Sequence, residues 1–221
     1  INGTPMEKPA LIAVGYLDFE MPEHLSPLPS TKGSDFVGVL YHEVGHALGV
    51  ASLAMDHAYG PLTQMTAWDS HLTDKYGTTL APGISVVKEG EEGSVDGPKF
   101  VVGEGINSGV YFHGDHVSEV LGEGNGLLIE GYEGNDPDLS HIELERSLMS
   151  HQDYRNYTTF MEAELAALQD IGYRIDRRNF YGFSIYGDGE TIVNENGYFA
   201  RNETGNAYLP SPILSSKNRT P

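Results

Sequence analysis

Apolar residues recur at helical spacing in two segments of the chain, and the first of these spans residues 35–50. Ser34 is a good N-cap for it, and Gly49 is placed to end it. Asp35 adds negative charge in the first turn, where the helix dipole favours it. The positions that share one face are Leu40, Val44, Ala47 and Leu48. This pattern predicts an amphipathic helix, because apolar residues three and four apart lie on the same side of a helix.

The second helical segment lies in the stretch YTTFMEAELAALQDIGYRID. Thr158 or Thr159 can act as its N-cap, and Glu162 and Glu164 fall near its N-terminus. The apolar positions that recur are Phe160, Leu165, Leu168 and Ile171. Gly172 follows them and predicts the end of the helix.

Short apolar or alternating runs predict strands in the rest of the chain. The run PALIAVGYLDFE, residues 9–20, lies between Pro9 and Pro22 and is typical of one strand. Residues 51–139 are rich in Gly and contain only a weak helical stretch, Met65–Tyr76. The short strands expected there are Phe100–Val102, Val110–Phe112 and Leu127–Glu130.

The order of these elements predicts an α+β domain over residues 1–178, in which residues 51–139 form an irregular, β-rich insertion. Residues 179–221 are rich in Gly, Asn and aromatic side chains, with short alternating stretches. They predict a β-rich C-terminal extension or the start of a following module.

Composition narrows the classes of partner and of site. The 221 residues include 32 acidic and 13 basic side chains, for a formal charge of −19. This charge disfavours nucleic acid and anionic membranes as partners, because phosphate binding depends on Lys and Arg. No apolar run approaches the ~20 residues of a membrane-spanning helix, so we expect no membrane insertion in this segment. Cysteine is absent, so any transition metal must be held by His and carboxylate side chains.

The sequence HEVGH, residues 42–46, carries the strongest chemical signal. His42 and His46 are four residues apart, so on a helix both imidazoles stand on one face, about 6 Å apart along the axis. A catalytic zinc takes three protein ligands and a water molecule. Glu43 follows the first histidine and is placed to act on that water as a general base. The spacing therefore predicts that His42 and His46 bind one zinc ion and that Glu43 is catalytic.

The same segment continues as HEVGHALG and resembles the zinc-binding helix of the metzincin clan of zinc peptidases, whose usual motif is H-E-x-x-H-x-x-G-x-x-H. Gly49 can adopt a positive φ and turn the chain off the helix. The position of the final histidine holds Ser52, a poor zinc ligand. On the residues alone, His57 and Asp56 are candidates for the third ligand, and so are later histidines. Exposed positions are the default expectation for His24 and His71, whereas the spacing of His113 and His116 fits a metal-binding pair and an exposed loop pair equally well.

The stretch SHIELERSLMS, residues 140–150, resembles the third ligand and Met-turn of the leishmanolysin-like branch of that clan. In that branch a long insertion separates the HExxHxxG helix from the third histidine. The matching motifs are spread over residues 34–176. The resemblance implies that His141 is the third zinc ligand and that Met149 is the residue of the Met-turn, beneath the metal.

The remaining site residues have more than one interpretation. Some zinc peptidases take their third ligand from a downstream glutamate, for which Glu162 and Glu164 are the candidates. His151 stands two residues past the methionine, where some metzincins carry a Tyr that stabilises the oxyanion, and Tyr154 follows it. Both are candidate catalytic residues, because either can donate a hydrogen bond to the developing charge. The acidic stretches EGNDPDLSH and YGDGE offer oxygen ligands for Ca²⁺, but neither has EF-hand spacing.

The residues and the resemblance together imply a metzincin-like zinc endopeptidase that acts on protein or peptide substrates as a monomer. Zinc would polarise the scissile carbonyl, and Glu43 would take the proton of the attacking water and pass it to the leaving amine. We expect an exported bacterial protein, secreted or on the cell surface, of which this chain is a mature fragment. The non-enzyme alternative is a surface adhesion module on a peptidase scaffold, against which the intact Glu43 argues.

Overall fold

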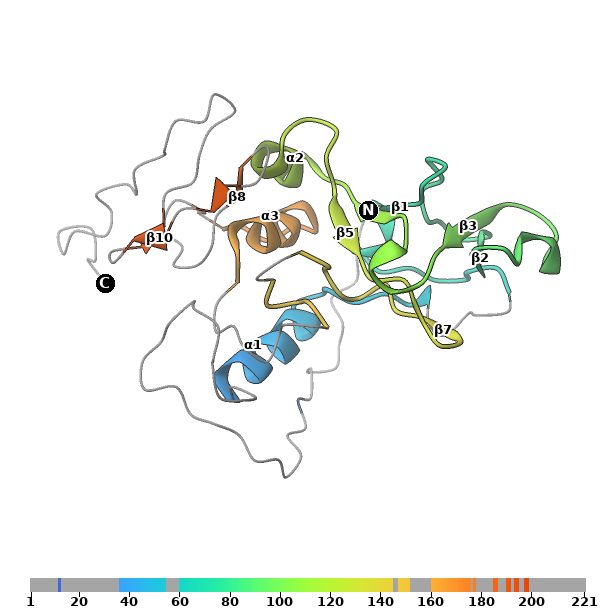
Figure 1. The fold of residues 1–221 in the computed structure, drawn as a ribbon, viewed down its shortest axis with the longest axis horizontal. Helices are drawn as coiled ribbons and strands as arrows, with labels where there is room; N and C mark the ends of the chain where they lie inside the picture. Colours follow the sequence, from blue (N-terminus) through green and yellow to red (C-terminus); the bar gives the residue numbers. More distant parts are fainter. Residues whose placement is uncertain are drawn as a thin grey trace.

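A computed structural model shows a mixed α+β fold (Figure 1). The residues it describes are 12, 36–54, 60–144, 147–151, 160–175 and 177, with the backbone of 185–186, 190–191, 193–194 and 197–198. Apart from Ile12, the strand predicted over residues 9–20 lies outside the described residues, as does the cap at Ser34.

The described residues form three α-helices: α1 at Phe36–Ala47, α2 at Asp115–Leu121 and α3 at Glu162–Asp170. Both predicted helices are confirmed, whereas α2 was not predicted. The cap expected at Thr158 or Thr159 is wrong, because the N-cap residue of α3 is Met161. The Met161 N–H donates to Glu164 Oε2 at 2.6 Å, so a glutamate in the first turn satisfies the amide that a threonine was expected to serve.

Three short strands make the central sheet. They are β1 at Leu72–Thr73, β4 at Val110–Phe112 and β5 at Leu127–Ile129, in the order β1-β4-β5 with antiparallel pairing. Beside it, β2 at Ser85–Lys88 pairs in parallel with β3 at Lys99–Val102. A small antiparallel pair, β6 at Tyr132–Glu133 and β7 at Asp136–Pro137, follows β5. The three strands predicted in this region are thus found as β3, β4 and β5.

The weak helix predicted at Met65–Tyr76 is wrong. The segment contains a single 3₁₀ turn, Asp69–His71, followed by β1. Two more such turns occur at Glu92–Ser94 and Gly105–Asn107. The Asp69 carboxylate accepts the backbone N–H of Thr66 at 2.8 Å, and such local side-chain bonds offer the backbone an alternative to helix.

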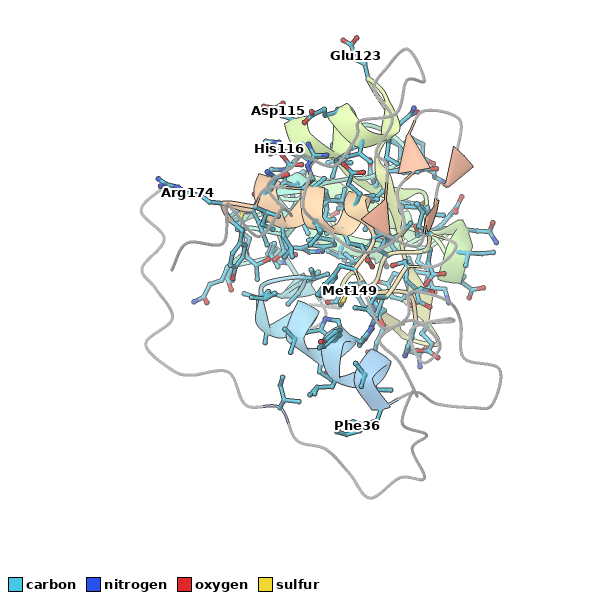
Figure 2. All side chains as sticks on the ribbon, turned by 90° about the vertical axis from the view of Figure 1, so that its left-hand side faces the viewer. Phe36, Asp115, His116, Glu123, Met149 and Arg174 are labelled. Atoms are coloured by element: carbon cyan, nitrogen blue, oxygen red, sulfur yellow. The ribbon has the colours of Figure 1, made fainter. Side chains whose placement is uncertain are left out.

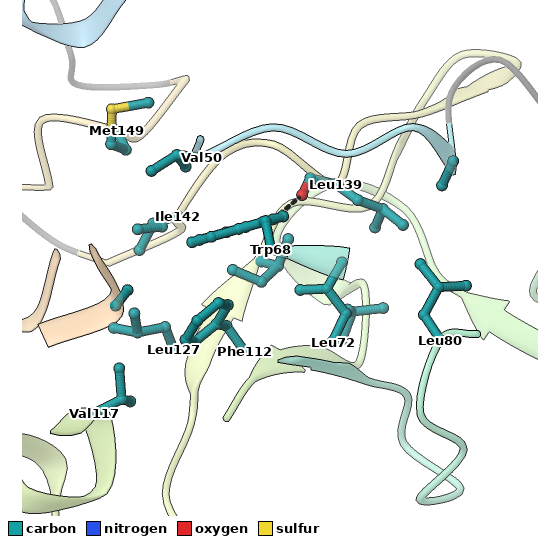
Figure 3. Close-up of a cluster of buried hydrophobic side chains, with 14 of the residues drawn as sticks. Val50, Trp68, Leu72, Leu80, Phe112, Val117, Leu127, Leu139, Ile142 and Met149 are labelled. Carbon is teal, nitrogen blue, oxygen red and sulfur yellow. Dashed lines mark hydrogen bonds between the residues drawn. The ribbon is translucent and has the colours of Figure 1, made fainter. Parts of the chain in front are cut away.

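A hydrophobic core lies under the central sheet and extends toward α1 (Figure 3). Its largest member, Trp68, is fully buried and packs on Phe112 with ring centroids 4.4 Å apart. The indole N–H of Trp68 donates to the Leu139 carbonyl at 2.8 Å. Residues of the predicted irregular insertion therefore build a packed core, and the indole holds the segment that leads to His141.

The helix α3 lies between α1 and α2 in Figure 1. Its last residue, Asp170, accepts the backbone N–H groups of His116 and Val117 at 2.9 and 3.0 Å. These two amides lie in the first turn of α2. The N-cap residue of α2 makes no side-chain hydrogen bond, so the Asp170 carboxylate caps the helix instead. Figure 2 places His116 on α2, on the far side of α3 from α1.

The predicted β-rich tail is described only in part. Its backbone forms two antiparallel pairs: β8 at Ile185–Tyr186 with β9 at Glu190–Thr191, and β10 at Val193–Asn194 with β11 at Gly197–Tyr198. Among the described residues, none of the helices has the length and apolar character needed to cross a membrane.

Candidate metal centre

Helix α1 brings His42 and His46 to one face, as the four-residue spacing predicts. Gly49 then turns the chain with a φ of +112°, a conformation that glycine adopts without strain. This turn returns the Val50 carbonyl to the helix, where it lies 2.7 Å from His46 Nδ1. The glycine of the motif thus both ends the helix and supplies the hydrogen-bond partner of the second histidine.

His141 arrives from an extended segment alongside β5. Its carbonyl accepts the Glu130 N–H at 3.0 Å, and the pairing continues as an isolated bridge between Ile129 and Ile142. The preceding residue, Ser140, accepts the backbone N–H of Ser52 through its hydroxyl at 3.0 Å. The chain after Gly49 therefore runs next to the His141 segment, although some ninety residues separate them in sequence.

Hydrogen-bond partners fix which ring nitrogen of each histidine carries the proton. His42 Nδ1 lies 2.8 Å from the Leu148 carbonyl, and His46 Nδ1 faces the Val50 carbonyl. A carbonyl oxygen only accepts, so both Nδ1 atoms must carry hydrogen. His141 Nδ1 lies 2.8 Å from Asp138 Oδ1 and donates to this carboxylate. In the neutral ring, each Nε2 is left with a lone pair.

The three Nε2 atoms converge on one point. His42 Nε2 lies 3.0 Å from His46 Nε2 and 3.3 Å from His141 Nε2. Burial lowers the pKa of His42 to about 3 and lowers that of His46, so these two rings are neutral at pH 7. Nε2 atoms that carry no hydrogen repel one another through their lone pairs at this distance, and a cation among them removes the repulsion. Ligand atoms about 2.1 Å from a tetrahedral zinc are about 3.4 Å apart, so the residues fit a zinc ion.

Asp138 orients His141. The pKa of the Asp138 carboxyl lies below its usual range. Burial raises this pKa, but the hydrogen bonds from His141 and from the Ser140 N–H lower it by more. A carboxylate behind a metal-binding imidazole fixes the ring and raises its basicity. Asp138 is therefore a positioning residue of this centre that the sequence did not identify, although it stands only three residues before His141.

The segment Ser147–Ser150 passes between α1 and α3 (Figure 1). The Leu148 carbonyl accepts from His42, and the next residue, Met149, is fully buried. Figure 2 shows Met149 facing α1. A Cβ built on Gly45 would lie 2.3 Å from Met149 Sδ, so only glycine at this place in the HEVGH motif lets the thioether approach so closely. Met149 thus lies in a turn that packs against the histidine helix.

Replacing Gly45 by alanine is expected to destabilise the protein. Overpacking of this kind costs about 1–3 kcal/mol, which outweighs a gain of about 1 kcal/mol for alanine within a helix. Denaturant unfolding measures the change, with Gly60→Ala as the control, since a Cβ on Gly60 has no atom within 4 Å. A Gly45→Ala variant as stable as the parent would show that Met149 does not pack on α1.

Glu164 holds this turn from α3. Its Oε1 accepts the Ser147 hydroxyl at 2.6 Å and the Met149 N–H at 2.8 Å, and its Oε2 accepts from Met161. Burial raises the pKa of Glu164 to about 7, although these hydrogen bonds act in the opposite direction. The other candidate for a glutamate ligand, Glu162, lies 3.3 Å from Arg177 Nη1. The structure thus directs both glutamates to structural partners and leaves them outside the histidine group.

The remaining candidates take different positions. Glu43 is exposed on α1, directly after His42. His151 is half-buried, and its ring stacks on His141 with centroids 4.5 Å apart and planes within 5°. The candidates that lie outside the described residues are Tyr154, His57, Asp56 and His24. His71, which binds the His113 carbonyl through Nδ1, does not belong to the histidine group, and neither do His113 and His116.

Searches for relatives add no family to this geometry. No protein-family model, no curated protein and no solved structure matches the chain. The described residues themselves contain a group of three histidines, His42, His46 and His141, that can hold one metal ion.

Proposed function

We propose that the protein is a zinc-dependent endopeptidase related to the leishmanolysin-like metzincins. One observation carries the proposal: the three imidazoles of His42, His46 and His141 present hydrogen-free Nε2 atoms to one point, and a glutamate follows the first of them on the same helix. Three nitrogen ligands are the donor set of several catalytic zinc sites. Supporting the family assignment are the HEVGHALG segment, the Leu148–Met149 turn and the helix α3 behind it.

Zinc, when bound, acts as a Lewis acid that polarises the scissile carbonyl and makes a water molecule more acidic. The chain's own contribution begins with Glu43, which accepts the proton of the attacking water and returns it to the leaving amine. An exposed carboxylate suits this role, since it is accessible to both water and substrate.

The supporting residues keep the three imidazoles in the orientation that binding needs. The carbonyls of Leu148 and Val50 hold the protons of two rings on Nδ1, and Asp138 does the same for the third. Because His42 and His46 lie on α1 and His141 lies beside β5, a bound metal would join these two segments. His151 and Tyr154 stay candidate donors to the oxyanion.

Metal removal tests this function. We expect the purified chain to cleave members of a quenched fluorescent peptide library, to lose that cleavage with 1,10-phenanthroline, and to regain it with added Zn²⁺. Calcium-selective chelation serves as the control and should leave cleavage intact. Cleavage that survives complete zinc removal would overturn the proposal. Bound zinc without cleavage of any library member would favour the adhesion module instead.

A further inference from the structure

A second group of ligand atoms lies behind His141, on the side of its Nδ1. We call Glu130, Asp138 and His151 the Glu130 cluster. Together with His141, their ligand atoms lie within 4.8 Å of one another. The cluster comes from three places: the end of β5, the segment before His141 and the residue that follows the Met149 turn. None of these three residues supplies one of the three Nε2 atoms, although Asp138 orients His141 from behind.

Glu130 is an unusual member, because its carboxylate is buried and incompletely satisfied. The residue is 3% exposed, and its Oε2 makes no hydrogen bond with any described part of the chain. In the described residues, no ion pair joins a Lys or Arg to Glu130 or Asp138. A buried carboxylate oxygen that accepts no hydrogen bond and has no Lys or Arg beside it is costly, and a bound cation removes that cost.

Distances within the cluster match those around a small cation. His151 Nδ1 lies 3.3 Å from Glu130 Oε2 and 3.8 Å from Asp138 Oδ2. Ligands about 2.1 Å from a tetrahedral ion are about 3.4 Å apart, so the three atoms need little movement to share one ion. Asp138 Oδ1 already accepts from His141, which leaves its Oδ2 directed to the cluster. The exposed Glu133, with Oε2 3.6 Å from His151 Nδ1, can add a further oxygen from the solvent side.

We propose that the Glu130 cluster is a second metal site, which takes a divalent transition metal of the zinc class through Glu130 Oε2, Asp138 Oδ2 and His151 Nδ1. One nitrogen and two carboxylate oxygens suit zinc, whereas calcium takes oxygen ligands and does not favour imidazole. This donor set thus favours zinc over calcium, for which the acidic stretch around Asp138 offers oxygen ligands. It uses none of the Nε2 atoms of the histidine group, so it does not depend on the proposed peptidase function.

Metal stoichiometry tests the second site without an assay of activity. The full chain is stripped of metal and titrated with Zn²⁺ alone, with calorimetry and elemental analysis as readouts. We expect two equivalents of zinc in the parent, one in Glu130→Gln, one in His151→Ala and one in His42→Ala. Glu123→Gln is the matched control, since Glu123 is exposed and lies away from both sites (Figure 2), and it should keep two. Asp138 is not varied, because it also orients His141.

The alternatives give different counts. One equivalent in the parent, lost in His42→Ala and retained in Glu130→Gln and His151→Ala, overturns the second site and reduces the cluster to an ion pair between His151 and Glu130. One equivalent that is lost in Glu130→Gln and His151→Ala but retained in His42→Ala supports the second site and overturns the zinc site of the proposed peptidase. His151→Ala keeps the test decisive if Glu130→Gln fails to fold, because His151 is the more exposed of the two.

Discussion

A Glu43→Gln variant is expected to bind zinc as the parent does and to lose its peptidase activity by a factor of about 10²–10⁴ in kcat/KM, the usual contribution of a general acid–base group. Glutamine has nearly the same shape, so the helix α1 and the neighbouring histidines should not move. It cannot accept a proton from water at neutral pH, however. The loss should therefore appear in kcat and leave the zinc content unchanged.

Steady-state kinetics on a fluorogenic peptide, with zinc analysis of the same preparation, makes the measurement. Glu123→Gln is again the control, because it makes the same chemical change at an exposed position. Glu123 lies on the opposite side of α3 from α1 (Figure 2). Parent-like turnover in Glu43→Gln would remove Glu43 from the mechanism. Loss of zinc together with activity would instead assign Glu43 a role in holding the centre.

The part of the site that lies within one helix could be predicted from the sequence. His42, Glu43 and His46 are fixed by the spacing of a helix, and Gly49 by its freedom to adopt a positive φ. These relations are local, so the residue pattern contains them. The same holds for α3, whose apolar spacing and terminal glycine mark its extent within a few residues.

The partners of these histidines could not be predicted from spacing. His141 was predicted as the third ligand only from the resemblance. Nothing in the residues around Ser52 indicates that the Ser52 N–H bonds to Ser140, next to His141. Asp138 lies in the acidic stretch EGNDPDLSH, whose composition does not indicate a bond to His141. Glu164 could be read as a zinc ligand, since a glutamate that binds metal and one that binds the amide of Met149 look alike in sequence. Long-range contacts decide each of these roles.

The insertion shows the same limit at the level of the fold. Its short strands β3, β4 and β5 were predicted from apolar runs, but α2 was missed. This helix is seven residues long and owes its cap to Asp170, which is distant in sequence. A helix stabilised from outside carries little signal of its own.

A His141→Ala variant is expected to lose zinc affinity by more than the 10–100-fold that removal of an outer-shell partner costs, and to lose peptidase activity with it. The reason lies in the geometry: without this ring, His42 and His46 supply two ligands from one helix, and the connection to the segment beside β5 is lost. Competition with a chromophoric zinc chelator measures the affinity, and circular dichroism shows whether the variant remains folded.

Two further variants make the result specific to the third ligand. His116→Ala removes a histidine on α2, beyond α3, and should leave zinc affinity and activity unchanged (Figure 2). His57→Ala tests the rival that the sequence leaves open, and it too should bind zinc as the parent does. If His57→Ala lost zinc and His141→Ala retained it, the third ligand would come from the segment directly after α1. The convergence of His141 Nε2 on His42 Nε2 at 3.3 Å predicts the opposite outcome.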